Sequence, residues 1–178
     1  MRLESVLGQL LTHRLVRQWL TRKGWIEMLS TAPRPELEQA LLRVAIPAAV
    51  MIYIAIDEFV GDPLTDTEHR ALWFAICFFA FAVVLAAFVL HAKSESPARR
   101  IFGIVADNVA NTAFLLLSGE GGAFVFGIYL FVTFGNGFRY GRLYLRISQV
   151  LSIAGFLIVL SLSPFWSAHI PVGIGILV

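Results

Sequence analysis

The sequence predicts an all-α, polytopic membrane helix bundle with five complete membrane-spanning segments and the opening of a sixth. Apolar residues make up 58% of the 178 residues, and the mean hydropathy is +0.77. This balance is far more apolar than that of a soluble domain. The apolar residues gather in long stretches, and the basic residues collect in every second connection between them. Together these two patterns indicate a chain that crosses a membrane repeatedly.

Each predicted segment is an apolar stretch bounded by polar or glycine-rich sequence. In chain order they are Leu41–Ile56, Ala71–Leu90, Ile101–Leu117, Ala123–Phe138, Val150–Leu162 and the opening Ile170–Val178. A helix needs about 20 residues to cross the hydrocarbon core, and the five complete segments approach this length once their flanks are counted. The sixth would span only about 14 Å as a helix. We therefore expect the chain to be cut inside its sixth helix.

The charges predict how the segments are oriented. Thirteen of the 14 Lys and Arg residues lie at or before the start of the first segment, between the second and third, or between the fourth and fifth. Arg70 is the exception, and the connections on its side carry acidic residues. These are Asp57, Glu58, Asp62, Asp66, Glu68 and Glu120. Because Lys and Arg mark the cytoplasmic face, we expect a multi-pass protein of the bacterial inner membrane with both ends in the cytoplasm.

The sequence before the first segment divides into two parts. Up to Leu15, apolar residues recur at helical spacing with basic residues on the other face, which is typical of a helix in the lipid interface; a partner-binding helix is the alternative. Pro35, followed by Glu36 and Glu38, marks a new helix start that continues into the first segment. We therefore expect a cytoplasmic amphipathic segment at 1–34 and a transmembrane domain at 35–178, truncated in its sixth helix.

Polar side chains inside the third segment are the main candidates for function. Asp107 and Asn111 are four residues apart and share one helix face, and Asn108 and Thr112 share the adjoining face. Ionisable groups at membrane depth are costly and are often functional, so we expect Asp107 to be buried against the fourth segment or another helix. Three interpretations are open: a structural hydrogen-bond network, a ligand or signalling site, and a proton or ion path.

The connection at Ser118–Gly122 is short enough to predict a tight loop, so that the third and fourth segments form a hairpin. Folding it about Glu120 places Asp107 level with Thr133 and Asn111 level with Tyr129. The polar face of one helix would then meet a polar face of the other. Each hydrogen bond between them would stabilise the bundle modestly.

The end of the fourth segment is rich in glycine, which allows a sharp change of backbone direction. The run Gly135–Gly141 contains three glycines in seven residues. Beyond it, Arg139, Arg142 and Arg146 fall at helical spacing. This spacing predicts one basic face of a helix lying at the cytoplasmic surface.

Motifs of enzymes and metal proteins are missing from the sequence. It contains no phosphate-binding glycine loop, no kinase phospho-acceptor box and no metal-ligand cluster. Cys77 is alone, which leaves no disulfide framework. We therefore expect no catalytic residue, metal site or cofactor in this part of the protein, membrane lipid as a partner, and no nucleic acid.

Several stretches resemble the membrane input domain of bacterial hybrid histidine kinases that sense diffusible signal factor, the Rpf-type sensor kinases. They are Gly119–Phe124, the run YLFVTFGNGFRYG at Tyr129–Gly141, PELEQALLR at Pro35–Arg43, and Ala106–Asp107 with Thr112. The resemblance covers about residues 35 to 166. The family is described with five spans and a short extracytoplasmic N-terminus, whereas the charges here favour six spans with both ends inside.

The resemblance implies a cis-2-unsaturated fatty-acid signal, cytoplasmic kinase and receiver domains, and a homodimer. The full-length protein would then be a sensor histidine kinase, although the same input could precede a diguanylate cyclase. Our predicted ligand-binding residues are Asp107, Asn111, Glu120 and Tyr129. Those predicted to transmit the signal are Asn136, Gly137, Arg139, Tyr140 and Arg142. With basic residues scarce on the outer side, neutral donors would bind the carboxylate, or the acid would enter protonated.

Two other classes of membrane protein are alternatives. One is a small membrane transporter. The other is a membrane CDP-alcohol phosphotransferase, which Gly103, Asp107 and Asn111 weakly resemble in their spacing. A single carboxylate makes a poor divalent-metal site, because hard cations take several oxygen ligands.

Overall fold

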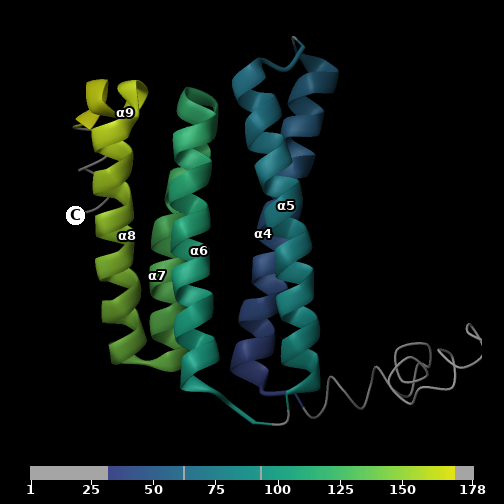
Figure 1. The fold of residues 1–178 in the computed structure, drawn as a ribbon, viewed down its shortest axis with the longest axis vertical. Helices are drawn as coiled ribbons and strands as arrows, with labels where there is room; N and C mark the ends of the chain where they lie inside the picture. The colour runs from purple at the N-terminus through teal and green to yellow at the C-terminus, as the bar shows by residue number, and fades with distance from the viewer. Residues whose placement is uncertain (1–31, 62, 93, 171–178) are drawn as a thin grey trace, which may run out of the picture.

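The computed structural model describes residues 32–61, 63–92 and 94–170, and all of its regular structure is helical (Figure 1). The elements are α4 (Arg34–Val60), α5 (Asp66–His91), α6 (Pro97–Ser118), the 3₁₀ helix η1 (Gly119–Phe126), α7 (Gly127–Tyr140), α8 (Arg142–Leu162) and α9 (Pro164–Ala168). The predicted amphipathic helix before residue 32 and nearly all of the predicted sixth segment lie outside the described residues. The all-α class is confirmed for the part that is described.

Local sequence signals account for the starts of the first three long helices. Pro35 lies in the first turn of α4, followed by the acidic Glu36, so the predicted helix start is confirmed. Thr65 and Glu68 cap the start of α5 reciprocally, each side chain bonding the backbone of the other. Ser96 accepts a hydrogen bond from the backbone of Arg99 at the start of α6. Each cap satisfies backbone groups that a helix end leaves free.

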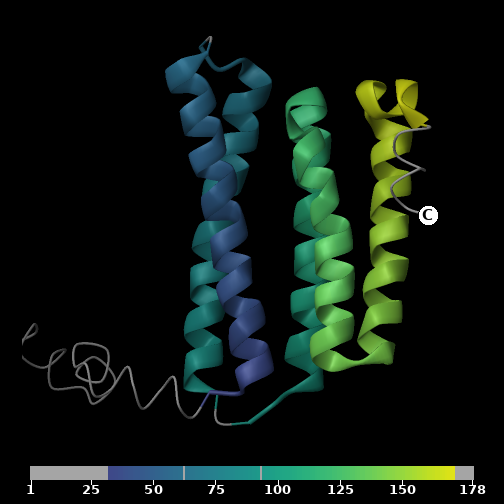
Figure 2. The same ribbon diagram turned by 180° about the vertical axis from the view of Figure 1, so that it is seen from behind.

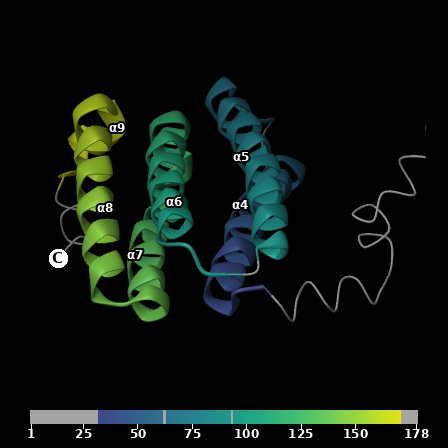
Figure 3. The same cartoon turned by 60° about the horizontal axis from the view of Figure 1, so that its bottom comes forward.

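The helices pack as a hairpin beside a three-helix unit. Helices α4 and α5 run antiparallel and pack along their length, while α6, α7 and α8 pack on one another. Helix α5 also packs on α6, so these two lie on the same side of the bundle (Figure 1). Seen from behind, α4 and α7 are in front (Figure 2). Figure 3 shows the same order, from the hairpin through α6 and α7 to α8.

The two ends of the bundle differ in charge as predicted. At the lower end in Figure 1, where α4, α6 and α8 begin, lie Arg34, Arg99, Arg100, Arg139 and Arg142. The opposite end carries Asp57, Glu58, Asp66, Glu68 and Glu120. We call these the basic end and the acidic end.

The outer surface between the two ends is apolar. Exposed large side chains occur on each long helix, for example Ile52, Trp73, Val109, Phe134 and Leu157, and an apolar belt of this kind suits lipid. Four helical stretches of the described chain are long and apolar enough to cross a membrane: Arg34–Val60, Asp66–His91, Pro97–Tyr140 and Arg142–Leu162. The third consists of α6, η1 and α7. Five spans with part of a sixth stays a prediction.

Two local expectations differ from the structure. The connection after α6 is not a tight loop followed by a long helix; the chain turns at Gly119, with φ +54°, and continues as η1 to Phe126. The predicted surface helix across Arg139–Arg146 is wrong, because Gly141 adopts φ +91° and ends α7. Arg139 therefore lies on α7, whereas Arg142 and Arg146 belong to the first turns of α8. Glycine alone adopts such a backbone without strain.

Candidate functional site

Helix α6 presents its polar residues to two different neighbours. Asp107 and Asn111 are buried on one face, and Asn108 is buried on the adjoining face together with the half-buried Thr112. The sequence predicted the two faces, with Asp107 buried against the fourth segment or another helix. In the structure only the second face meets α7. The first faces the α4–α5 hairpin.

Asp107 is held by two side chains of α4. Its carboxylate accepts hydrogen bonds from Arg43 Nε at 2.5 Å and Arg43 Nη2 at 2.8 Å, and from Gln39 Nε2 at 3.0 Å. Both members of the ion pair are buried, at 8% residue exposure each. The prediction that Asp107 is buried against a helix is confirmed, and the helix is α4. Arg43 passes close to Gly103, where an added Cβ would lie 2.5 Å from Nη2.

The second polar face joins α6 to α7 and α8. Asn108 Oδ1 accepts a hydrogen bond from Ser152 Oγ at 2.7 Å, and Ser152 bonds Thr133 at 2.9 Å. Thr112 bonds the hydroxyl of Tyr129 at 2.6 Å. This last pair differs by one position from the predicted one, which placed Asn111 level with Tyr129. Interhelical hydrogen bonds of this kind hold membrane bundles together.

A pocket lies between the hairpin and the three-helix unit. Its walls come from α4, α5, α6, η1 and α7, and most of its lining is apolar. Its cavity volume is about 60 Å³, which is smaller than the roughly 300–1,000 Å³ of most small-molecule sites. Gln39, Arg43, Asp107 and Asn111 are its polar lining residues. The pocket therefore has one polar region in an otherwise apolar interior.

The four predicted ligand residues do not form one cluster. Asp107 and Asn111 line the pocket together. Tyr129 is buried instead among α6, α7 and α8, packed against Phe126 and Phe156 as well as bonded to Thr112. Glu120 is exposed on η1 at the acidic end.

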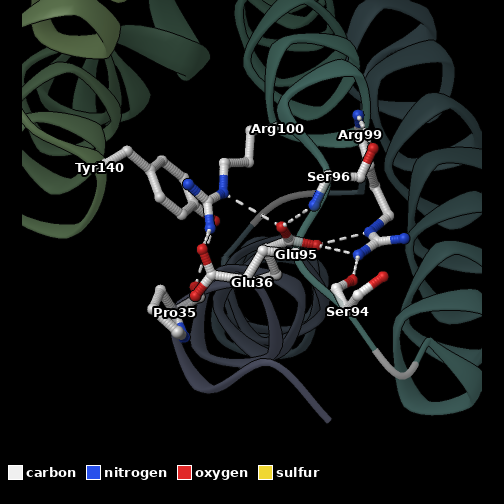
Figure 4. A network of polar contacts seen from close by, with 8 residues as sticks. All are labelled: Pro35, Glu36, Ser94, Glu95, Ser96, Arg99, Arg100 and Tyr140. Atoms are coloured by element: carbon white, nitrogen blue, oxygen red, sulfur yellow. Dashed lines mark hydrogen bonds and ion pairs between the residues drawn. The ribbon is translucent and has the colours of Figure 1, made fainter.

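At the basic end, a second polar cluster ties α4 to α6 (Figure 4). Glu36 of α4 is 4% exposed, and its carboxylate lies 2.5 Å from Arg99 and 3.0 Å from Arg100. It also accepts the backbone N–H of Ser96 at 2.9 Å. Arg100 pairs with Glu95 as well. Glu36 thus links the start of α4 to the start of α6.

The predicted transmission residues lie at the basic end of α7 and the start of α8. Tyr140 donates to the carbonyl of Pro35 at 3.1 Å, and Arg100 lies 4.8 Å from the centre of its ring. Arg139 donates to Gln39 Oε1 at 3.3 Å. Two side chains of α7 therefore contact α4.

The other three predicted transmission residues either contact α8 or belong to it. They are Asn136, Gly137 and Arg142. Asn136 donates to Ser148 at 3.3 Å. An added Cβ on Gly137 would lie 2.8 Å from the side chain of Leu145, so α7 and α8 approach closely there. Arg142 is exposed.

Sequence reasoning missed the contribution of α4. Glu36, Gln39 and Arg43 each bond a residue of α6, yet Arg43 was grouped with the charges of the cytoplasmic connections. A signal was available, because these residues fall at i, i+3 and i+7 and so share one helix face. A charged stripe that continues into an apolar segment indicates a polar partner on another helix.

Within 32–61, 63–92 and 94–170, no group of three or more His, Cys, Asp or Glu side chains is placed to hold a metal ion. The described residues form a mostly apolar pocket with one polar region. Beside it, the buried ion pair of Arg43 and Asp107 connects α4 to α6.

Comparison with known proteins finds a similarity to a sensory protein. The four apolar helical stretches and the similarity described next support an integral membrane domain related to a sensory protein. Over 153 residues, or 85% of this chain, it is 28% identical to the sensory/regulatory protein RpfC of Xanthomonas campestris pv. campestris, in two strains. The chain covers 20% of the length of RpfC. No protein-family model matches the chain, and no solved structure matches it.

Proposed function

We propose that this chain is the membrane input domain of a sensor histidine kinase that responds to a cis-2-unsaturated fatty acid. The observation that carries the proposal is the similarity to a sensory/regulatory protein across 85% of the chain. The motifs that resemble the Rpf-type input domain include Tyr129–Gly141, which forms most of α7 and the turn after it. The apolar pocket between the helices supports a ligand of lipid character.

In the proposed topology, α4, α5, α6, α7 and α8 cross the inner membrane, and a sixth span follows. The basic end faces the cytoplasm, because the Lys and Arg residues of short connections favour that side. The full-length protein would be a homodimer that carries cytoplasmic kinase and receiver domains.

Of the four predicted ligand residues, Asp107 and Asn111 line the proposed binding pocket. A fatty acid partitions into the bilayer through its tail, at about 0.8 kcal/mol for each buried CH₂, and can reach the pocket laterally. Tyr129 would act by holding α6 against α7. Glu120 would lie at the outer surface, on a segment that borders a second, smaller pocket at Gly121.

Transmission would follow the contacts between α4 and α7. A ligand shifts an equilibrium only through its different affinities for two states. A molecule between the hairpin and the three-helix unit favours one spacing of α4 and α7. Arg139 and Tyr140 connect those two helices at the basic end, and Gly141 joins α7 directly to α8. The cytoplasmic domains would respond to that movement.

The direct test is equilibrium binding by the domain purified in lipid nanodiscs. A medium-chain cis-2-enoic acid should bind saturably, and its trans isomer should bind about tenfold or more weakly, because the straight chain does not place head and tail together in the pocket. Empty nanodiscs measure partitioning into lipid alone. Equal binding of both isomers, or binding no greater than to empty nanodiscs, would contradict the proposal.

A further inference from the structure

Asn111 is a buried amide without a hydrogen bond in the described part of the chain. Its residue exposure is 6%, and neither Nδ2 nor Oδ1 has a partner among the described residues. A buried polar group without a partner costs about 1–3 kcal/mol. Buried amides of proteins are nearly always paired, so this one requires an explanation. Because Asn111 lines the pocket, a bound molecule could supply the missing partners.

The other polar side chains of the pocket are already engaged. Both oxygens of Asp107 accept hydrogen bonds from Arg43, and Gln39 donates to one of them. The carbonyl of Gln39 accepts from Arg139. Asn111 is therefore the one polar lining residue whose side chain leaves both a donor and an acceptor free among the described residues.

The charges of the pocket favour a neutral head group. Arg43 and Asp107 neutralise each other through two hydrogen bonds. An ionised ligand head would have to take Arg43 away from Asp107, leaving a buried carboxylate without its cation, and such an exchange is costly. A neutral head that pairs with Asn111 leaves the ion pair intact.

The order of the lining residues along the helices indicates how an amphiphilic ligand would be oriented in the pocket. Gln39, Arg43 and Asp107 lie on the basic-end side of Asn111, since α4 and α6 both start at that end. On the acidic-end side the lining is apolar, with Val50, Phe74, Phe114, Val125 and Ile128. A chain of methylene groups can extend from Asn111 along this wall.

We infer that Asn111 is the head-group site for a single-chain amphiphile bound in its neutral form, with a carboxylic acid as the head. The protonated acid donates its O–H to Asn111 Oδ1, and its carbonyl oxygen accepts a hydrogen bond from Asn111 Nδ2. Both unpaired atoms of the amide then have a partner. The tail lies along the apolar wall toward the acidic end. This inference rests on the proposed function, and it adds the residue, the protonation state and the orientation of the ligand.

The first experiment replaces Asn111 with Leu in the intact chain in nanodiscs and measures binding of the cis-2-enoic acid. Loss of two hydrogen bonds should weaken binding about tenfold or more. Val109→Leu is the control, since Val109 is exposed on the same helix, and it should bind as the parent does. Because the unpaired amide costs stability without ligand, Asn111→Leu should keep the helical circular dichroism of the parent and have a thermal midpoint at least as high.

The second experiment leaves the protein unchanged and varies the head group. The primary amide of the same chain carries both a donor and an acceptor and should compete with the acid at similar concentration. The methyl ester has no donor and should compete about tenfold or more weakly. If Asn111→Leu binds like the parent, or the ester competes like the acid, the inference is wrong while the proposed function stands. If the parent binds no acid at all, both fall.

Discussion

Replacing Asp107 with Asn is expected to destabilise the domain by about 3–5 kcal/mol, because it leaves the buried charge of Arg43 without its partner. Asp107 and Arg43 share two hydrogen bonds at 2.5 and 2.8 Å and are equally buried. Arg43 lies nine residues into α4, about 13 Å from its start. The free energy of unfolding, measured by SDS titration in mixed micelles, is the appropriate observable.

A double variant separates the loss of the pair from the loss of packing. Arg43→Met combined with Asp107→Leu removes both charges and keeps apolar volume, so most of the lost stability should return. Glu38→Gln is the control, since Glu38 is exposed and pairs with Arg139 at 3.5 Å; exposed pairs contribute little. A single Asp107→Asn variant as stable as the parent would refute this account of the ion pair.

Replacing Glu36 with Gln is expected to destabilise the domain by about 1–3 kcal/mol, because hydrogen bonds to charged groups are the stronger ones. Glu36 is buried and bonds Arg99, Arg100 and the backbone of Ser96. Its loss frees the start of α4 from the start of α6. Hydrogen exchange should therefore accelerate at residues 94–100, while the acidic ends of α4 and α5 remain as protected as before.

The same exchange experiment on Glu95→Gln provides the comparison. Glu95 also pairs with Arg100, but its side chain is 56% exposed. We expect a change of stability below about 1 kcal/mol and no acceleration of exchange. If Glu95→Gln lowered stability and accelerated exchange as much as Glu36→Gln does, burial of Glu36 would not explain its contribution to stability.

Much of the helical framework follows from local sequence. Pro35 and Glu36 mark the start of α4 correctly, and the alternation of basic and acidic connections places each loop at the proper end. Asp107 could be predicted as buried because a carboxylate at that depth is too costly in contact with lipid. Folding the hairpin about Glu120 places Asn111 level with Tyr129, whereas the residue that bonds Tyr129 is the next one, Thr112.

The site could not be predicted in full because its partners are far apart in sequence. Arg43 and Asp107 are separated by 64 positions, and no periodicity within one helix identifies the helix that it will face. The helix expected across Arg139–Arg146 failed for a different reason. The spacing of arginines was helical, but the positive φ of Gly141 turns the chain between them, and spacing alone does not show which glycine will turn.

A sensor must change conformation when its signal binds, so a ligand-dependent distance tests the central claim most directly. Spin labels at exposed positions of α4 and α7, introduced by Ile52→Cys and Phe134→Cys with Cys77→Ala, report the spacing of the two helices across the pocket. Pulsed electron paramagnetic resonance in nanodiscs should show a shift of about 1–2 Å, typical of helix movements, with the cis-2-enoic acid but not with its trans isomer. Saturating cis acid with an unchanged distance distribution would contradict the sensor account.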